Sequence, residues 1–207
     1  MKSIIFHALA WSAVPAVIAS SLPACSTKPV TPCKCPEGTQ LSESVTVSVL
    51  GAAVGDVAAV VNDFYNSGWL GAVPFKTQGP NNKAGVSTRT SLFPTAIGVY
   101  NISELLYEYE VKHDGSFVQS FEQLPSTVPV EYHSNNGSFS GYWVTLEGTR
   151  IFEYETLIRW SVYACETGHV QDFAAFHEGA LNNASSILSA QGKIKGINVD
   201  PVSAQAF

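Results

Sequence analysis

A switch of hydrophobic period near the C-terminal end of the chain constrains the fold most. Between residues 151 and 163 apolar and polar side chains alternate, with Leu157 as the exception. This period of two predicts a long antiparallel strand with one solvent-facing side. From His169 to Ala190 the apolar residues recur instead at helical spacing, as Phe173, Phe176 and Ala180 show. A long strand that leads into a long amphipathic helix, after a run of strands, predicts a curved sheet wrapped around that helix, often enclosing a cavity.

Composition narrows the possible partners. The 207 residues are 45% hydrophobic and 11% aromatic, enough to fill the core of one domain. The formal net charge is −6 and no run of basic residues is present. We therefore expect neither nucleic acid nor an anionic membrane surface as a partner.

The N-terminal residues 1–24 resemble a secretion signal. Lys2 precedes an apolar stretch that ends in small residues, and its length and Pro15 disfavour stable membrane insertion. The alternatives are a buried N-terminal helix, or lipidation at Cys25. Three glycosylation sequons, which begin at Asn101, Asn136 and Asn183, favour a secreted or secretory-pathway protein.

Four cysteines remain after such a cleavage: Cys25, Cys33, Cys35 and Cys165. In an oxidising compartment a disulfide is a better interpretation than a metal site. Cys33 and Cys35 are too close in sequence for an easy mutual bridge. We therefore predict that Cys165 pairs with Cys33 or Cys35, and we predict no metal site.

The order of elements predicts an α+β fold. A Cys- and Pro-rich lead-in (25–43) precedes a strand (45–49) and a helix (52–64). No helix is predicted between residues 73 and 164, where one strand is expected before a turn at 79–83 and others at 86–93, 103–111, 117–123, 130–146 and 151–164. The domain is expected to span 44–191, followed by a disordered tail at 192–207.

Several segments, taken in order, carry a family resemblance. They are Val45-Thr46-Val47-Ser48-Val49, the helix that ends Val60-Val61-Asn62-Asp63-Phe64, Trp69, residues 85–90, residues 104–106, Pro129-Val130-Glu131-Tyr132, and a Gly148-Thr149-Arg150 turn leading to Trp160. With them the chain resembles the START and birch-pollen-allergen (SRPBCC) superfamily, in its polyketide cyclase/dehydrase-like branch. The resemblance implies a helix-grip fold, in which a curved seven-stranded antiparallel sheet surrounds a long C-terminal helix and an internal cavity for hydrophobic molecules. A lipocalin-type barrel is the alternative, which the helix after the first strand disfavours.

Two charged or titratable residues are candidates for chemistry. His177 lies on the apolar stripe of the last helix, where an imidazole can move protons near neutral pH. Its alternative role is a core histidine hydrogen-bonded to a strand. Arg89 is a lone charge in its strand and is expected either to bind a ligand oxygen or to pair with Glu104 or Glu108 on the solvent-facing side.

Aromatic residues supply the candidate ligand-binding set: Tyr107, Tyr109, Tyr142, Tyr154, Trp160 and Phe173. Plain core packing is the alternative role for each of them. No nucleophile, zinc-binding or phosphate-loop motif is present, so we expect no cofactor and no hydrolytic triad.

The function predicted from sequence is the enclosure of a small hydrophobic metabolite, polyketide- or terpenoid-like, in the secretory pathway. Whether the protein also catalyses a cofactor-free cyclisation, isomerisation or dehydration is left open. The alternatives are a non-catalytic lipid or sterol carrier, a secreted effector, and a fold whose core is filled by aromatics. Sequence does not identify the ligand or the oligomeric state.

Overall fold

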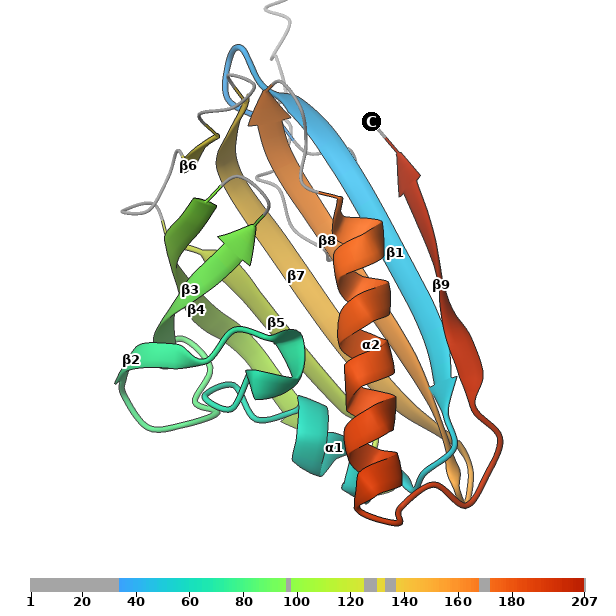
Figure 1. Cartoon of the computed structure of the whole chain (residues 1–207). Coiled ribbons are helices and arrows are strands. Elements are labelled where there is room, and N and C mark those ends of the chain that lie inside the picture. The colour runs from blue at the N-terminus through green and yellow to red at the C-terminus, as the bar shows by residue number, and fades with distance from the viewer. Residues whose placement is uncertain (1–33, 96–97, 125–129, 133–136, 168–171, 207) are drawn as a thin grey trace, which may run out of the picture.

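The computed structural model describes residues 34–95, 98–124, 130–132, 137–167 and 172–206 (Figure 1). The predicted signal segment, Cys25, Cys33 and the sequon at Asn136 lie outside these residues.

The described chain forms one antiparallel sheet and two α-helices. The sheet contains nine strands in the order β2-β3-β4-β5-β7-β8-β1-β9, and β6 pairs with β7 off this path. The strands are β1 (Gln40–Leu50), β2 (Pro74–Gln78), β3 (Thr88–Thr95), β4 (Gly98–Val111), β5 (Phe117–Gln123), β6 (Val130–Tyr132), β7 (Gly137–Phe152), β8 (Glu155–Thr167) and β9 (Val199–Ala206). The helices are α1 (Val54–Val61), a 3-10 turn η1 (Gly68–Leu70) and α2 (Phe173–Ala190).

The predicted helix-grip architecture is confirmed. The sheet curves around α2, which lies along its concave face, and α1 covers the lower end of that face (Figure 1). The described residues form nine strands rather than the seven implied by the resemblance. The strand predicted at 130–146 is divided into β6 and the start of β7, and the C-terminal β9 was not predicted from sequence.

The prediction of a disordered tail was wrong, because its last residues form β9 on the edge of the sheet beside β1. The Oγ atoms of Thr46 and Ser203 lie 2.8 Å apart, and the Ser48 hydroxyl donates to the Val199 carbonyl at 2.8 Å. The tail is polar because it is an edge strand with one exposed face, and not because it lacks structure.

A glycine contact brings the tail to this edge. A Cβ built on Gly51 would lie 2.5 Å from the Gly196 carbonyl oxygen, so the two backbones approach more closely than any side chain allows.

The predicted turn at Gly148-Thr149-Arg150 was also wrong. β7 continues through these residues to Phe152, and the turn follows it at residues 153–154. A Cβ on Gly148 would lie 2.2 Å from the Phe117 ring, so this glycine makes room for an aromatic side chain within a continuous strand.

A β-bulge between Leu106 and Glu108 changes which side chains of β4 face inward. The alternation read from sequence placed Glu104 on the solvent-facing side, with Tyr107 and Tyr109 opposite. In the structure Glu104 is 2% exposed and Leu106 is fully buried. The extra residue at the bulge shifts the phase, so a constant period of two assigns the first half of this strand to the wrong face.

The predicted disulfide is confirmed with Cys35 as the partner of Cys165. It joins residues separated by 130 positions and ties the lead-in to the end of β8. A bridge across so long a loop contributes about 3–5 kcal/mol by restricting the unfolded chain.

Within the described residues, no helix combines the length and the apolar character that crossing a membrane requires.

Candidate functional site

The concave face of β1 is polar. Ser42, Ser44, Thr46 and Ser48 are each no more than 3% exposed, whereas Val47 on the opposite face is 41% exposed. Valines are the usual inward residues of a half-buried strand, and here the order is reversed. A row of hydroxyl groups therefore lies inside the molecule, and we call these four residues the serine row.

His177 is in contact with this row. It is 1% exposed, its Nδ1 lies 3.2 Å from the Thr46 Oγ1, and its ring stacks on Trp160 with centroids 3.8 Å apart. Burial lowers its pKa to about 3, so the ring is neutral at physiological pH. These contacts favour the core-histidine alternative, and a neutral buried ring of this kind is a poor proton carrier near pH 7.

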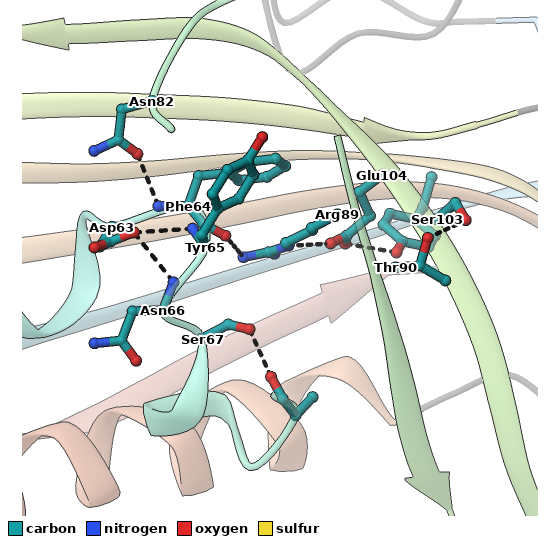
Figure 2. A network of polar contacts seen from close by, with 12 residues as sticks. Asp63, Phe64, Tyr65, Asn66, Ser67, Asn82, Arg89, Thr90, Ser103 and Glu104 are labelled. Carbon is teal, nitrogen blue, oxygen red and sulfur yellow. Dashed lines mark hydrogen bonds and ion pairs between the residues drawn. The ribbon is translucent and has the colours of Figure 1, made fainter. Parts of the chain in front are cut away.

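Arg89 belongs to a buried polar network (Figure 2). Its Nε donates to the Glu104 Oε2 at 2.5 Å and its NH1 donates to the Phe64 carbonyl at 2.9 Å. The guanidinium carbon lies 4.4 Å from the Phe64 ring centroid and 4.7 Å from that of Phe121. Tyr142 donates to the other oxygen of Glu104 at 2.7 Å.

This network corrects one sequence expectation. Arg89 does pair with Glu104, but the pair lies in the interior and not on a solvent-facing side, since both side chains are no more than 3% exposed. Every charged group in the network has a partner, and its role is to link β3, β4 and β7 to the segment after α1.

Glu166 presents the opposite case. It is 1% exposed, and neither carboxylate oxygen has a hydrogen-bond partner in the described part of the chain. Alternation along β8 places it on the same side as Trp160 and Ala164, facing the interior. Burial raises its pKa to about 7, and the neighbouring Ser42 hydroxyl acts in the opposite direction.

Further orphan groups lie on the same concave face. Among the described residues, the hydroxyls of Ser42, Ser44 and Ser91 and the indole nitrogen of Trp160 are buried without a partner. Buried polar groups in native proteins are nearly always paired with protein, water or ligand. We call Glu166, Ser42 and Ser44, which lie on the adjacent strands β8 and β1, the orphan cluster.

The orphan cluster lies beyond the start of α2. Figure 1 shows that β1, β7 and β8 extend past the first turn of this helix, toward β6. Thr46, the β1 residue that His177 contacts, is four positions from Ser42 along the strand. The helix therefore packs against one half of the concave face, where it also covers Trp160, and the other half carries Glu166 and Ser42.

The predicted aromatic set is scattered. Tyr142 and Trp160 face the interior as described, and Phe173 is 8% exposed at the first position of α2. Tyr109 lies at a structural junction, where its hydroxyl accepts from the amides of Asn62 and Asn82. Burial, with a smaller contribution from the charge of Asp63, raises its pKa.

The other two tyrosines lie away from the orphan cluster. Tyr154 is in the β7–β8 turn with the Lys195 ammonium 5.1 Å from its ring centroid. Tyr107 is half-buried at the bulge of β4. Neither position supports a role in binding at the orphan cluster.

A separate open groove of about 330 Å³ lies between η1 and α2. It is lined by Trp69, Leu70, Gly71, Ala175, Phe176, Gly179, Ala180 and Asn183. The Asn183 amide donates to the Trp69 carbonyl at 2.9 Å, so this sequon asparagine also ties η1 to α2. Asn101, the other described sequon asparagine, is exposed on β4.

Sequence reasoning missed Glu166 and the serine row. Glu166 lies in Cys165-Glu166-Thr167 at the end of a strand, a place where a glutamate is usually solvated. One signal was available, because continuing the alternation inward from Trp160 and Val162 reaches residue 166. Within the described ranges, no group of three or more histidine, cysteine or acidic residues could hold a metal ion.

The comparisons with known proteins agree with this architecture. The family model described as a START domain matches residues 42–205. The chain belongs to the START-domain family. The START relationship predicted from sequence is thereby confirmed. No curated protein shows significant sequence similarity to this chain.

Solved structures with a similar chain path are remote in sequence. Ara h 8.0201 is 9% identical, covers 73% of this chain and 99% of its own length, and has a TM-score of 0.49. An uncharacterised protein from Bacillus thuringiensis is 14% identical over 71% of this chain and 98% of its own, with a TM-score of 0.48. Norcoclaurine synthase from Thalictrum flavum, solved with dopamine and hydroxybenzaldehyde, is 14% identical over 76% of this chain and 91% of its own, with a TM-score of 0.46. No argument about function rests on these three.

Proposed function

We propose that this START-domain protein encloses a small, largely apolar molecule against the half of the concave face that α2 leaves free. The observation that carries the proposal is the orphan cluster, because buried polar atoms without partners are costly unless a ligand or water satisfies them. The apolar side chains of Val144, Val162 and Phe121 share this face and supply surface for the body of the ligand.

We place this activity in the secretory pathway or outside the cell. The Cys35–Cys165 disulfide supports an oxidising compartment. The signal-like residues 1–24 and the exposed Asn101 and Asn183 sequons support the same location. The ligand proposed from sequence is a polyketide- or terpenoid-like metabolite, and a non-catalytic lipid or sterol carrier and a secreted effector are the alternatives.

One observation favours catalysis as a second candidate function. A general acid–base works best when its pKa lies near the operating pH, and the pKa of Glu166 is raised to about 7. We therefore move the proposed proton transfer of a cofactor-free cyclisation, isomerisation or dehydration from His177 to Glu166. A Glu166→Gln variant that still binds ligand but no longer turns it over would support this version.

The binding proposal is tested by filling the interior. Ser44→Trp places an indole on the concave face, and Val47→Trp places the same group on the outer face of the same strand. We expect a neutral apolar dye such as Nile red to bind the wild type and Val47→Trp equally, and Ser44→Trp at least about tenfold more weakly. Thermal melting establishes that both variants fold.

Should Ser44→Trp not fold, mass spectrometry of small molecules released from the purified wild type supplies the second readout. Equal binding of the dye by the two tryptophan variants, or a wild type that binds no dye and releases no small molecule, contradicts the proposal.

A further inference from the structure

Among the residues that the structure describes, the charge on Glu166 has no counter-ion in the interior. The titratable groups that face the interior from the other described elements are Arg89 on β3, Glu104 and Tyr109 on β4, Tyr142 on β7 and His177 on α2, and Tyr109 is bonded to Asn62 and Asn82. Arg89 is committed to Glu104, and Tyr142 is bonded to the same carboxylate. The His177 ring is neutral, and β1 presents only hydroxyl groups.

The nearby acidic groups do not face the orphan cluster. Glu43 on β1 lies on the outer face, where it interacts with Tyr163. Asp172 is exposed and caps the start of α2 by accepting from the Ala175 amide at 2.8 Å. Within the described part of the chain, an ionised Glu166 is therefore a buried negative charge without a paired cation, whereas Glu104 has Arg89.

We infer that the Glu166 carboxylate, with the Ser42 hydroxyl beside it, is the binding site for a protonated amine on the enclosed ligand. The inference rests on the proposed function and names its ligand class: an apolar molecule that carries one basic nitrogen. An ammonium group supplies both the missing positive charge and several N–H donors for two unpaired oxygens.

Other polar groups satisfy the site less well. A ligand alcohol donates one hydrogen bond and leaves the buried charge uncompensated. A ketone is an acceptor, so it can bond only to the protonated form of Glu166. Both an alcohol and an amine make a charge-assisted hydrogen bond to the ionised carboxylate, but only the ammonium also compensates its buried charge, so the amine is favoured whenever Glu166 is ionised.

The preference depends on pH in a defined direction. With a pKa of about 7, Glu166 is mostly protonated at pH 6 and mostly ionised at pH 8. The affinity for an amine relative to an alcohol of equal chain length should therefore rise between these two pH values.

The experiment compares three probes that share one apolar chain: octylamine, 1-octanol and 2-octanone. Each is titrated against Nile red bound to the wild type, Glu166→Gln and Glu43→Gln. The two variants remove the same formal charge, one inside the molecule and one on its outer face. Melting at pH 5, where Glu166 is protonated, establishes that both variants fold.

We expect octylamine to bind the wild type and Glu43→Gln about tenfold more tightly than 1-octanol at pH 8. In Glu166→Gln the two affinities should become equal, while 1-octanol still binds. If all three probes bind the wild type but octylamine is not preferred, or if the preference survives in Glu166→Gln, the amine site is refuted and the proposed function stands. If neither the dye nor any probe binds, both are refuted.

Discussion

Two buried glutamates on the same concave face have opposite surroundings. Glu104 on β4 receives Arg89 at one oxygen and Tyr142 at the other, and it is 2% exposed. Glu166 on β8 is 1% exposed and neither of its oxygens has a hydrogen bond of normal geometry among the described residues, and the neighbouring Ser42 hydroxyl lowers its pKa only weakly against the effect of burial. Burial alone therefore does not mark a functional carboxylate in this fold. The difference is whether the protein supplies the partners itself.

The same contrast separates the two halves of the interior. Around α2 the hydroxyl and imidazole groups are paired within the protein, as the contacts of His177 with Thr46 and of Thr46 with Ser203 show, and the Trp160 indole nitrogen is the exception among the described residues. Beyond the helix the hydroxyls of Ser42 and Ser44 lack such partners among the described residues. We interpret the first half as structural and the second as the place where a ligand completes the core.

The largest expected effect comes from breaking the satisfied carboxylate. Arg89→Met leaves Glu104 buried without its cation, and we expect it to lower the free energy of unfolding by about 3–5 kcal/mol. Arg159→Met is the matched control, because Arg159 and its partner Glu147 are 43% and 33% exposed and such pairs are worth less than about 1 kcal/mol. Denaturant titration measures both variants, and equal losses would contradict the account.

His177 should make the fold sensitive to acid. Its pKa is about 3 in the folded state and 6.5 is the ordinary value, so below pH 6.5 the unfolded chain binds a proton that the folded chain does not. Stability should therefore fall as the pH drops from 6.5 toward 3. His177→Phe keeps a ring against Trp160 but has no group that titrates. Between pH 7 and pH 4.5 its free energy of unfolding should therefore fall by about 2–3 kcal/mol less than that of the wild type.

The measurement for His177 is denaturant unfolding of both proteins at a series of pH values. Parallel pH profiles for the wild type and His177→Phe would show that the ring takes up a proton inside the folded protein.

Glu166 should act in the opposite direction. Its folded pKa of about 7 exceeds the ordinary 4.5, so the folded chain holds a proton that the unfolded chain has lost, and stability falls as the pH rises from 4.5 to 7. Without ligand, Glu166→Gln should be about 2 kcal/mol more stable than the wild type at pH 8, after allowance for screening by solvent, and equal to it at pH 4.5. A variant that is less stable than the wild type at pH 8 would mean that the carboxylate has protein partners.

The smallest effect is expected at the serine row. Ser44→Ala removes a hydroxyl that has no described partner, so the free energy of unfolding should change by less than about 1 kcal/mol or even rise. Thr46→Val removes a hydroxyl two residues away that contacts His177 and Ser203, and it should cost about 1–2 kcal/mol. Thermal melting of the two variants measures both losses. Equal losses would contradict the distinction between a satisfied half and an unsatisfied half of the interior.

The sequence predicted the architecture but not the site. The switch from period two to helical spacing predicted the sheet and α2, and the compartment argument predicted the Cys165 bridge. Both predictions use information that can be read from the residue types along the chain. The inward position of Glu104 depends on a bulge, and that of the β1 serines depends on which face the sheet presents to α2. Neither the bulge nor the choice of the inward face can be read from the residues of one strand alone.

The same limit explains Arg89 and His177. His177 was chosen for its place on an apolar helix stripe and Arg89 as the lone charge of its strand, and the structure buries both. Their hydrogen-bond partners come from positions far away in the sequence, 131 residues away in the case of His177 and Thr46. The three-dimensional structure is therefore needed to decide whether a buried polar group has a hydrogen-bond partner.

A crystal structure of the protein grown with 1-octanol tests the central claim most directly. The account predicts electron density for the ligand on the concave face beyond α2, with its hydroxyl within hydrogen-bond distance of the Glu166 carboxylate or the Ser42 hydroxyl. Density confined to the groove between η1 and α2, or a Glu166 whose oxygens are both bonded to protein groups, would contradict it.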